Sequence, residues 1–248
     1  MIANMTLSEK GLQFQKYVRL SNKLGHFGDL SNMIALTLSL DEIKIKDGYV
    51  LKGEKLGGDL GWYINLYTER EADASEVGEL TLPELPPDYR FSHRNNQSFF
   101  ENLRVPFTEM GIFQAVVLWN AWSQLPMYWH SLYDARIYLY EKNLVESILN
   151  MDAESSSRQT VDYGYCDKLE QVRNYLHGRV EELKGFPADF LNPLVKIDGD
   201  RAIVYVSFWN NYSGLIVSEH PIRRIGNTVA FGQPNHHVIF KYRCPICF

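Results

Sequence analysis

The chain has 248 residues, of which 45% are hydrophobic and 22% are charged. This composition is typical of a folded globular protein and excludes an intrinsically disordered chain. The formal net charge of −5 argues against nucleic acid as a partner, because sequence-independent binding needs clustered lysine and arginine to displace counterions. The N-terminal residues lack the basic and apolar regions of a secretory signal, and the longest apolar stretch, Met110 to Trp122, is too short for a membrane span of about 20 residues. We therefore expect a cytoplasmic protein without a membrane partner.

The first third of the chain combines a helix signal with several strand signals. Thr6 to Glu9 has the spacing of a capping box, which predicts a helix over about 7–24. Strict alternation from Ile34 to Leu40 predicts a half-buried strand, with a helix as the alternative because leucine and alanine are good helix formers. Asp47-Gly48 predicts a hairpin with a type I′ turn. A second turn and a third strand are predicted at Gly57-Gly58 and Trp62–Leu66.

From Glu69 to Asp88 the chain is acidic and interrupted by prolines. Only Arg70 opposes the acidic residues, which are Glu69, Glu71, Asp73, Glu76, Glu79, Glu84 and Asp88. Irregular segments of this length inside a compact domain are usually functional or flexible. We expect a contact surface for a basic protein partner here, carried by Glu71, Glu76, Glu79 and Glu84.

Helical periodicity returns in the middle of the chain. Phe107 to about Leu125 is predicted as a helix with Thr108 as its N-cap, and Pro126 ends it. Two further helices are predicted over about 127–149 and 167–184. The last portion returns to strands, with a hairpin around Asp198-Gly199 and strands at Leu215–Ser218, Thr228–Phe231 and Val238–Tyr242.

The order of strands, then helices, then strands is that of an α+β fold. We predict N- and C-terminal antiparallel β regions packed with a central group of about three helices plus an N-terminal helix. A single domain over residues 1–248 accommodates this order. The alternative is a subdivision into 1–90 (helix and β meander), 91–185 (helical) and 186–248 (β).

Cys244-Pro-Ile-Cys247 is the sharpest local motif. Two thiolates at this spacing form half of many zinc sites. A structural zinc ion needs four ligands, and the nearest substitutes are His236, His237 and Cys166. The other interpretation makes both cysteines small apolar residues at the end of the last strand. We therefore expect no cofactor, with zinc at Cys244, Cys247 and His236 as the alternative.

One group of candidate catalytic residues follows the aromatic-rich stretch around Pro126. His130, Asp134 and Arg136 could line a ligand pocket together with the neighbouring rings. The same aromatic spacing also fits a hydrophobic core.

A second group, His220 with Arg223 and Arg224, could bind an anionic or phosphorylated molecule, because arginine offers a bidentate fork. The alternative is a loop with solvated charges. The sequence contains neither a Gly-x-Ser-x-Gly elbow nor a phosphate-binding Walker loop.

Phe208 to Tyr212 is predicted as a hairpin tip, where Trp209 and Tyr212 would be aromatic anchors for a partner. Arg223 and Arg224 would add basic groups to the binding surface. With the acidic segment and the lack of a catalytic motif, these features favour a non-enzymatic binding protein of the inhibitor or immunity type. The alternative is an enzyme that acts on a small molecule or phosphate ester through a pocket of histidine, arginine and aspartate.

Overall fold

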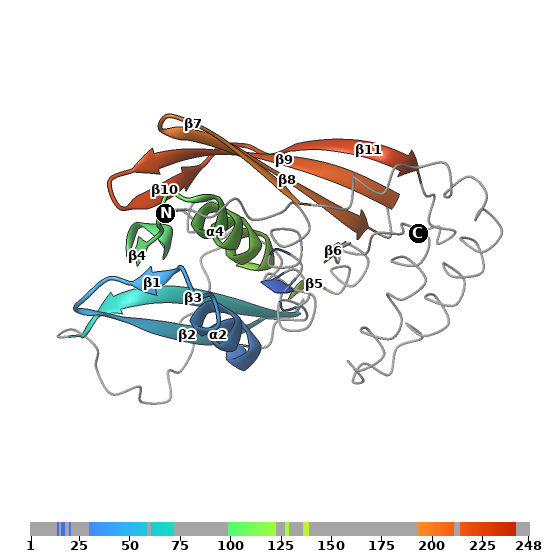
Figure 1. The fold of residues 1–248 in the computed structure, drawn as a ribbon. Helices are drawn as coiled ribbons and strands as arrows, with labels where there is room; N and C mark the ends of the chain where they lie inside the picture. Colours follow the sequence, from blue (N-terminus) through green and yellow to red (C-terminus); the bar gives the residue numbers. More distant parts are fainter. Residues whose placement is uncertain are drawn as a thin grey trace.

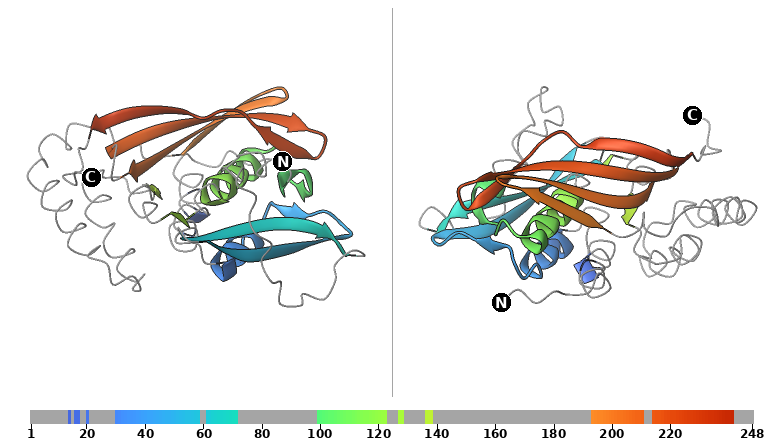
Figure 2. Two further views of the ribbon diagram at one scale, coloured as in Figure 1. Left: turned by 180° about the vertical axis from the view of Figure 1, so that it is seen from behind. Right: turned by 45° about the horizontal axis from the view of Figure 1, so that its top comes forward.

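The computed structural model of the chain describes residues 30–58, 61–71, 99–122, 127–128, 136–138, 193–210 and 214–241, together with Phe14, Lys16, Tyr17 and Leu20 (Figure 1). Antiparallel sheets and helices share one core, which confirms the predicted α+β class. Helix α4 (Glu109–Trp122) lies between a large sheet and a smaller one (Figures 1 and 2). The subdivision into 1–90, 91–185 and 186–248 stays a prediction.

The predicted strand at Ile34–Leu40 is wrong, because this segment belongs to helix α2 (Leu30–Leu38). Met33, Leu36, Thr37 and Leu40 are all buried, at steps of three and four residues. This spacing places them on one side of a helix, which packs against α4 and the smaller sheet. The N-terminal helix prediction agrees with the structure at Phe14, Lys16, Tyr17 and Leu20, which are helical.

The Asp47-Gly48 turn is confirmed, but the hairpin pairing predicted around it is wrong. Gly48 has a φ of 79°, a value that glycine adopts without strain. The strand before the turn, β1 (Lys44–Ile45), pairs with β4 (Leu103–Arg104) instead of β2 (Tyr49–Gly58). The backbone N–H of Lys46 then continues this alignment by donating to Asn102 O at 2.9 Å.

The smaller sheet is built around a long hairpin. Strand β2 pairs along its whole length with β3 (Gly61–Arg70), which contains the third strand predicted at Trp62–Leu66. Its turn joins Gly58 to Gly61, slightly beyond the predicted Gly57-Gly58 position. Strand β5 (Met127–Tyr128) adds a third member to the sheet by pairing with Gly61 and Trp62.

Helix α4 confirms the helix and N-cap predicted from Phe107. The Gly111 N–H donates to Thr108 Oγ1 at 3.1 Å, which satisfies one of the free donors of the first turn. An added Cβ at Gly111 would meet Pro106 O at 2.3 Å, so the chain entering the helix needs glycine there. Eleven of the helix's 14 residues are buried, as expected of a helix that is apolar all round. Among the described residues, no helix is long and apolar enough to cross a membrane.

The helix predicted over about 127–149 is wrong where the structure describes it. Met127–Tyr128 forms β5, and Arg136–Tyr138 forms β6, which pairs with Phe208–Asn210. Pairing with distant strands therefore overrides local helical periodicity at these residues. The helix predicted over 167–184 lies outside the described residues.

The large sheet confirms every C-terminal strand that the sequence predicted. Strands β7 (Leu194–Asp198) and β8 (Arg201–Asn210) form the hairpin around Asp198-Gly199. Strand β8 also pairs with β9 (Gly214–Ile225). The opposite side of β9 holds β10 (Thr228–Phe231) near its end and β11 (Asn235–Lys241) near its start. The sheet is thus about four strands wide, with β8 and β9 at its centre.

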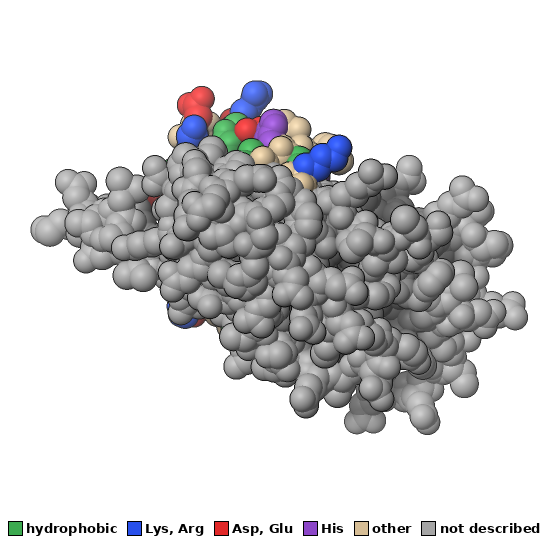
Figure 3. Space-filling view, turned by 90° about the vertical axis from the view of Figure 1, so that its right-hand side faces the viewer, with side chains coloured by type: hydrophobic (Ala, Val, Ile, Leu, Met, Phe, Trp, Pro, Cys, Tyr) green, Lys and Arg blue, Asp and Glu red, His purple; other side chains and the backbone are tan. Residues whose placement is uncertain are grey.

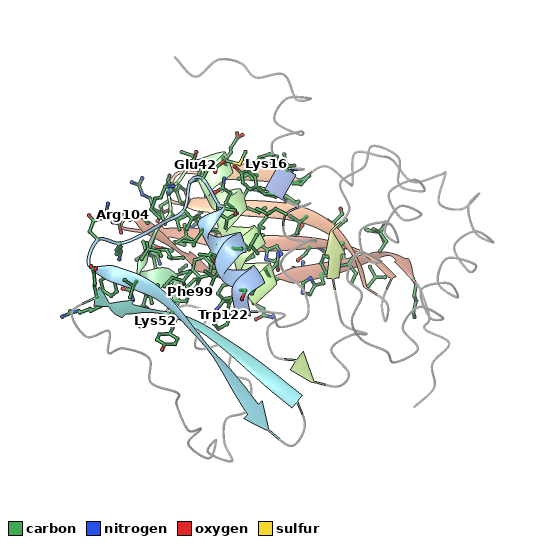
Figure 4. All side chains as sticks on the ribbon, turned by 90° about the horizontal axis from the view of Figure 1, so that it is seen from below. Lys16, Glu42, Lys52, Phe99, Arg104 and Trp122 are labelled. Atoms are coloured by element: carbon green, nitrogen blue, oxygen red, sulfur yellow. The ribbon has the colours of Figure 1, made fainter. Side chains whose placement is uncertain are left out.

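Aromatic rings tie α4 to the loop before it and to the large sheet. Trp119 stacks on Phe231 with ring centroids 4.3 Å apart, and Phe100 meets both rings. On the other side of Phe100, Phe99 stacks on Trp122 (Figure 4). Thr228 Oγ1 donates to Phe100 O at 2.7 Å in the same buried region. The predicted aromatic core is therefore present, and α4 is its centre.

A polar contact fastens the N-terminal helical residues to the segment after α2. Tyr17 Oη donates to Asp41 Oδ2 at 2.5 Å, and Lys16 Nζ donates to the same oxygen at 3.1 Å. These two hydrogen bonds, that of Tyr17 first, lower the pKa of Asp41 from its ordinary value of 3.8. Burial, followed by the hydrogen bond to Asp41, raises the pKa of Tyr17.

We expect Thr108→Ala to lower the free energy of unfolding by about 1 kcal/mol, because the first turn of α4 loses its cap. Thr108→Ser keeps the hydroxyl and should stay close to the wild type. Urea denaturation followed by circular dichroism measures both. Equal stability of Thr108→Ala and the wild type would contradict the capping role.

We also expect acid to weaken the contact at Asp41. The pKa of the Asp41 carboxyl group is lower in the folded chain than in the unfolded chain. Such a group stabilises the fold when the pH is above its pKa in the unfolded chain. This stabilisation is lost as the pH falls through its pKa in the folded chain. Tyr17→Phe removes the strongest cause of the shift. The loss of stability as the pH falls below the ordinary Asp41 pKa of 3.8 should then be smaller in Tyr17→Phe than in the wild type. An identical loss in both proteins would show that this contact contributes nothing.

Candidate functional site

Of the predicted pocket of His130, Asp134 and Arg136, the structure describes only the backbone of Arg136. His130 and Asp134 lie outside the described residues. Arg136 begins β6, where its backbone lies opposite Asn210. The catalytic role of these three residues therefore stays a prediction.

The structure separates the residues of the second predicted pocket, His220 with Arg223 and Arg224. Burial alternates along β9, so that His220 is 1% exposed on the side that faces α4. Arg223 is exposed on the opposite side of the sheet, opposite Arg201. Arg224 lies over the Phe107 ring at 6.0 Å and donates from Nε to Gly226 O. An anion site built on His220 and Arg223 is therefore wrong, because the pleat of the strand points them apart.

His220 instead joins a buried polar cluster that the sequence analysis missed. Its Nε2 atom lies 3.0 Å from Ser218 Oγ and accepts from Asn120 Nδ2 at 3.3 Å. All three side chains are at most 1% exposed. An amide NH2 group only donates, so the ring nitrogen Nε2 is the acceptor in the contact with Asn120. The sequence signal was the pair Ser218 and His220, two polar residues at alternate positions of a predicted strand.

This serine, histidine and asparagine cluster has the residue types of a nucleophilic triad but not its geometry. In a triad the nucleophile and the orienting group contact opposite nitrogens of the histidine ring. Here the hydroxyl and the amide both meet Nε2. The side chains are also buried between α4 and β9, where a substrate has no access. The cluster therefore joins helix and sheet and is not a catalytic site.

The predicted zinc ligands are not brought together within the described residues. Cys244 and Cys247 lie outside them. His236 is in β11, with its ring edge-on to Phe208 at 6.0 Å, whereas His237 contacts Glu219 at 3.6 Å. The two neighbouring histidines thus point to opposite sides of the sheet, as predicted. Within the described part of the chain, no group of three or more candidate ligands surrounds a metal position.

Of the predicted acidic and aromatic binding residues, Glu71 and Trp209 belong to the described part of the chain. Glu71 is exposed directly after β3, while Glu76, Glu79 and Glu84 lie outside the described residues. The β8–β9 hairpin predicted here is confirmed, since Asn210 pairs with Gly214; the backbone of Trp209 pairs with Leu215 and Ile137 at the end of β8. Tyr212 also lies outside the described residues.

One surface of the large sheet faces away from α4, and no described element covers it (Figures 1 and 2). We call this surface the outer face and define it by the side chains of Leu194, Lys196, Asp198, Arg201, Ile203, Tyr205, Glu219, Pro221 and Arg223. Leu194 is 45% exposed and Ile203 is 38% exposed. The neighbouring residues in sequence, Val195, Ala202 and Val204, point to the opposite surface of the sheet and are buried. Side chains of several kinds gather over this sheet at the top of Figure 3.

The charged groups of the outer face are arranged in an unusual way. Arg201 and Arg223 lie directly opposite each other on β8 and β9, where like charges are normally destabilising. Asp200 relieves this only in part, since its carboxylate is 3.8 Å from Arg223 Nε and both groups are exposed. Lys196 Nζ lies 5.1 Å from the centre of the Tyr205 ring. The outer face therefore combines exposed aliphatic side chains with cations that nothing in the described residues neutralises fully.

Comparison of the chain with protein-family models, with curated protein sequences and with solved structures finds no match. Function must therefore be argued from the residues and their geometry.

We expect His220→Phe to lower the free energy of unfolding by about 1 to 3 kcal/mol, because Ser218 and Asn120 lose a buried partner. Ser218→Ala should cost less in the His220→Phe background than in the wild type, since the partner of its hydroxyl is already gone. A double-mutant cycle by urea denaturation measures this coupling. Additive costs would show that Ser218 and His220 do not interact.

Proposed function

We propose that this chain acts without catalysis, by binding protein partners. The observation that supports this most directly is the outer face, where Leu194 and Ile203 are exposed among charged side chains. Scattered exposed aliphatic residues are ordinary, but here they share one sheet surface with an aromatic ring and an arginine pair. Arginine and tyrosine are enriched at protein contact surfaces.

The more specific proposal is an inhibitor or immunity-type protein with a basic partner. Its support is the acidic segment Glu69 to Asp88, of which Glu71 is exposed at the end of β3. A cluster of carboxylates accelerates the encounter with a basic surface and does so most strongly at low salt. We therefore assign partner attraction to Glu71, Glu76, Glu79 and Glu84.

The alternative enzymatic function has no supporting observation in the described residues. The one buried histidine cluster lacks both the geometry and the access that catalysis requires. Chemistry at His130 and Asp134 stays a prediction from the sequence alone.

Affinity purification from the native source with matched variants tests the proposal. Ile203→Glu places a charge in the centre of the outer face, whereas Leu38→Glu makes the same change at an exposed leucine of α2. We expect that a protein which binds the wild type also binds Leu38→Glu equally well. The same protein should not bind Ile203→Glu. An identical set of bound proteins for all three baits would contradict a binding role for the outer face.

A further inference from the structure

The residues of the outer face form three rows across the central strands. Register places Arg201 opposite Arg223, Ile203 opposite Pro221, and Tyr205 opposite Glu219. The middle row is apolar. It is flanked by two cations on one side, and by an aromatic ring and a carboxylate on the other.

This order is self-complementary. A two-fold axis that lies along the Ile203–Pro221 row exchanges the two flanking rows between copies facing each other. Arg223 of one copy then lies over Glu219 of the other. The apolar residues of both middle rows meet at the axis. Face-to-face sheets pack about 10 Å apart, a separation that extended arginine and glutamate side chains bridge.

The charges also select this orientation over the other two-fold arrangement. An axis parallel to the strands, between β8 and β9, would place Arg201 over Arg223 of the second copy. In the favoured arrangement, Lys196 is the one outer-face cation that lies close to the same residue of the second copy. Its ammonium group is directed toward the Tyr205 ring and so away from the axis.

Nucleic acid fits this surface less well than protein does. Asp198 and Glu219 share the face with the arginines, and carboxylates repel a phosphate backbone. The exposed Leu194 and Ile203 side chains also gain nothing from phosphates.

We propose that the outer face binds a second copy of this chain in a two-fold dimer, with Arg223 of each copy paired to Glu219 of the other. This inference rests on the proposed function, because both require the outer face to be a protein contact surface. The contact is small: three strands about 4.8 Å apart and about five residues long span roughly 14 Å by 17 Å. The dimer is therefore weak and forms in the micromolar range or above.

Sedimentation velocity of the purified full chain tests the dimer, from about 1 to 300 µM, a range suited to a weak interface. The wild type should shift from monomer to dimer across this range. Arg223→Glu and Glu219→Arg each replace two attractive contacts by two repulsive ones, so each variant should raise the dimer Kd about tenfold or more.

The decisive sample is an equimolar mixture of the two variants. In a mixed dimer, Glu at position 223 faces Arg at position 219, and the native Glu219 faces the native Arg223. The mixture should therefore dimerise at concentrations at which each variant alone stays largely monomeric, which also shows that both are folded. A mixture that stays monomeric, with both variants folded by circular dichroism, overturns the dimer.

A wild type that stays monomeric at every concentration overturns it as well. In that case the affinity purification separates the two proposals. If a protein other than this chain binds the wild type but not Ile203→Glu, the proposed binding function holds and only the dimer is wrong. Binding of a DNA or RNA oligonucleotide that is lost with Arg223→Glu, without any dimer, would contradict the choice of occupant.

Discussion

Helix α4 imposes the constraint on which the remaining structure depends. Eleven of its 14 residues are buried, so apolar surface must surround it on all sides. The large sheet supplies one side through the inward residues of β8 and β9, and α2 with the aromatic pair Phe99 and Phe100 supplies others. Two buried polar residues then fix how the helix is rotated. Gln114 Oε1 accepts from the Glu42 backbone N–H at 2.9 Å, and Asn120 donates to His220.

This arrangement makes the two surfaces of the large sheet different in burial. The inner surface is committed to the core, and its histidine serves as a partner for the helix. The outer surface keeps exposed aliphatic residues and two opposed arginines, whose like charges do not favour folding. Alternation along β8 and β9 thus gives the sheet one buried side and one exposed side, and we propose that the exposed side binds protein.

The sequence predicted the features that short-range chemistry determines. The Thr108 cap and the Asp198-Gly199 hairpin were correct because each depends on neighbouring residues alone. The apolar residues from Ile34 to Leu40 fit both the two-residue period of a strand and the spacing of one face of a helix. The segment forms a helix because that face is buried against α4. Met127–Tyr128 became a strand only by pairing with distant Gly61 and Trp62. The outer face was not predictable, because its rows depend on register between strands and on which side α4 covers.

The central claim is that the inner side of β8 is sealed by the core while its outer side receives a second copy. Hydroxyl-radical footprinting of the unmodified chain tests both sides of one strand, through Tyr205 on the outer face and Phe208 inside. Tyr205 should be oxidised in dilute protein and become protected as the concentration rises through the dimer range. Phe208 should be protected throughout. Oxidation of Tyr205 that is independent of concentration, or ready oxidation of Phe208 in the folded protein, would contradict the account.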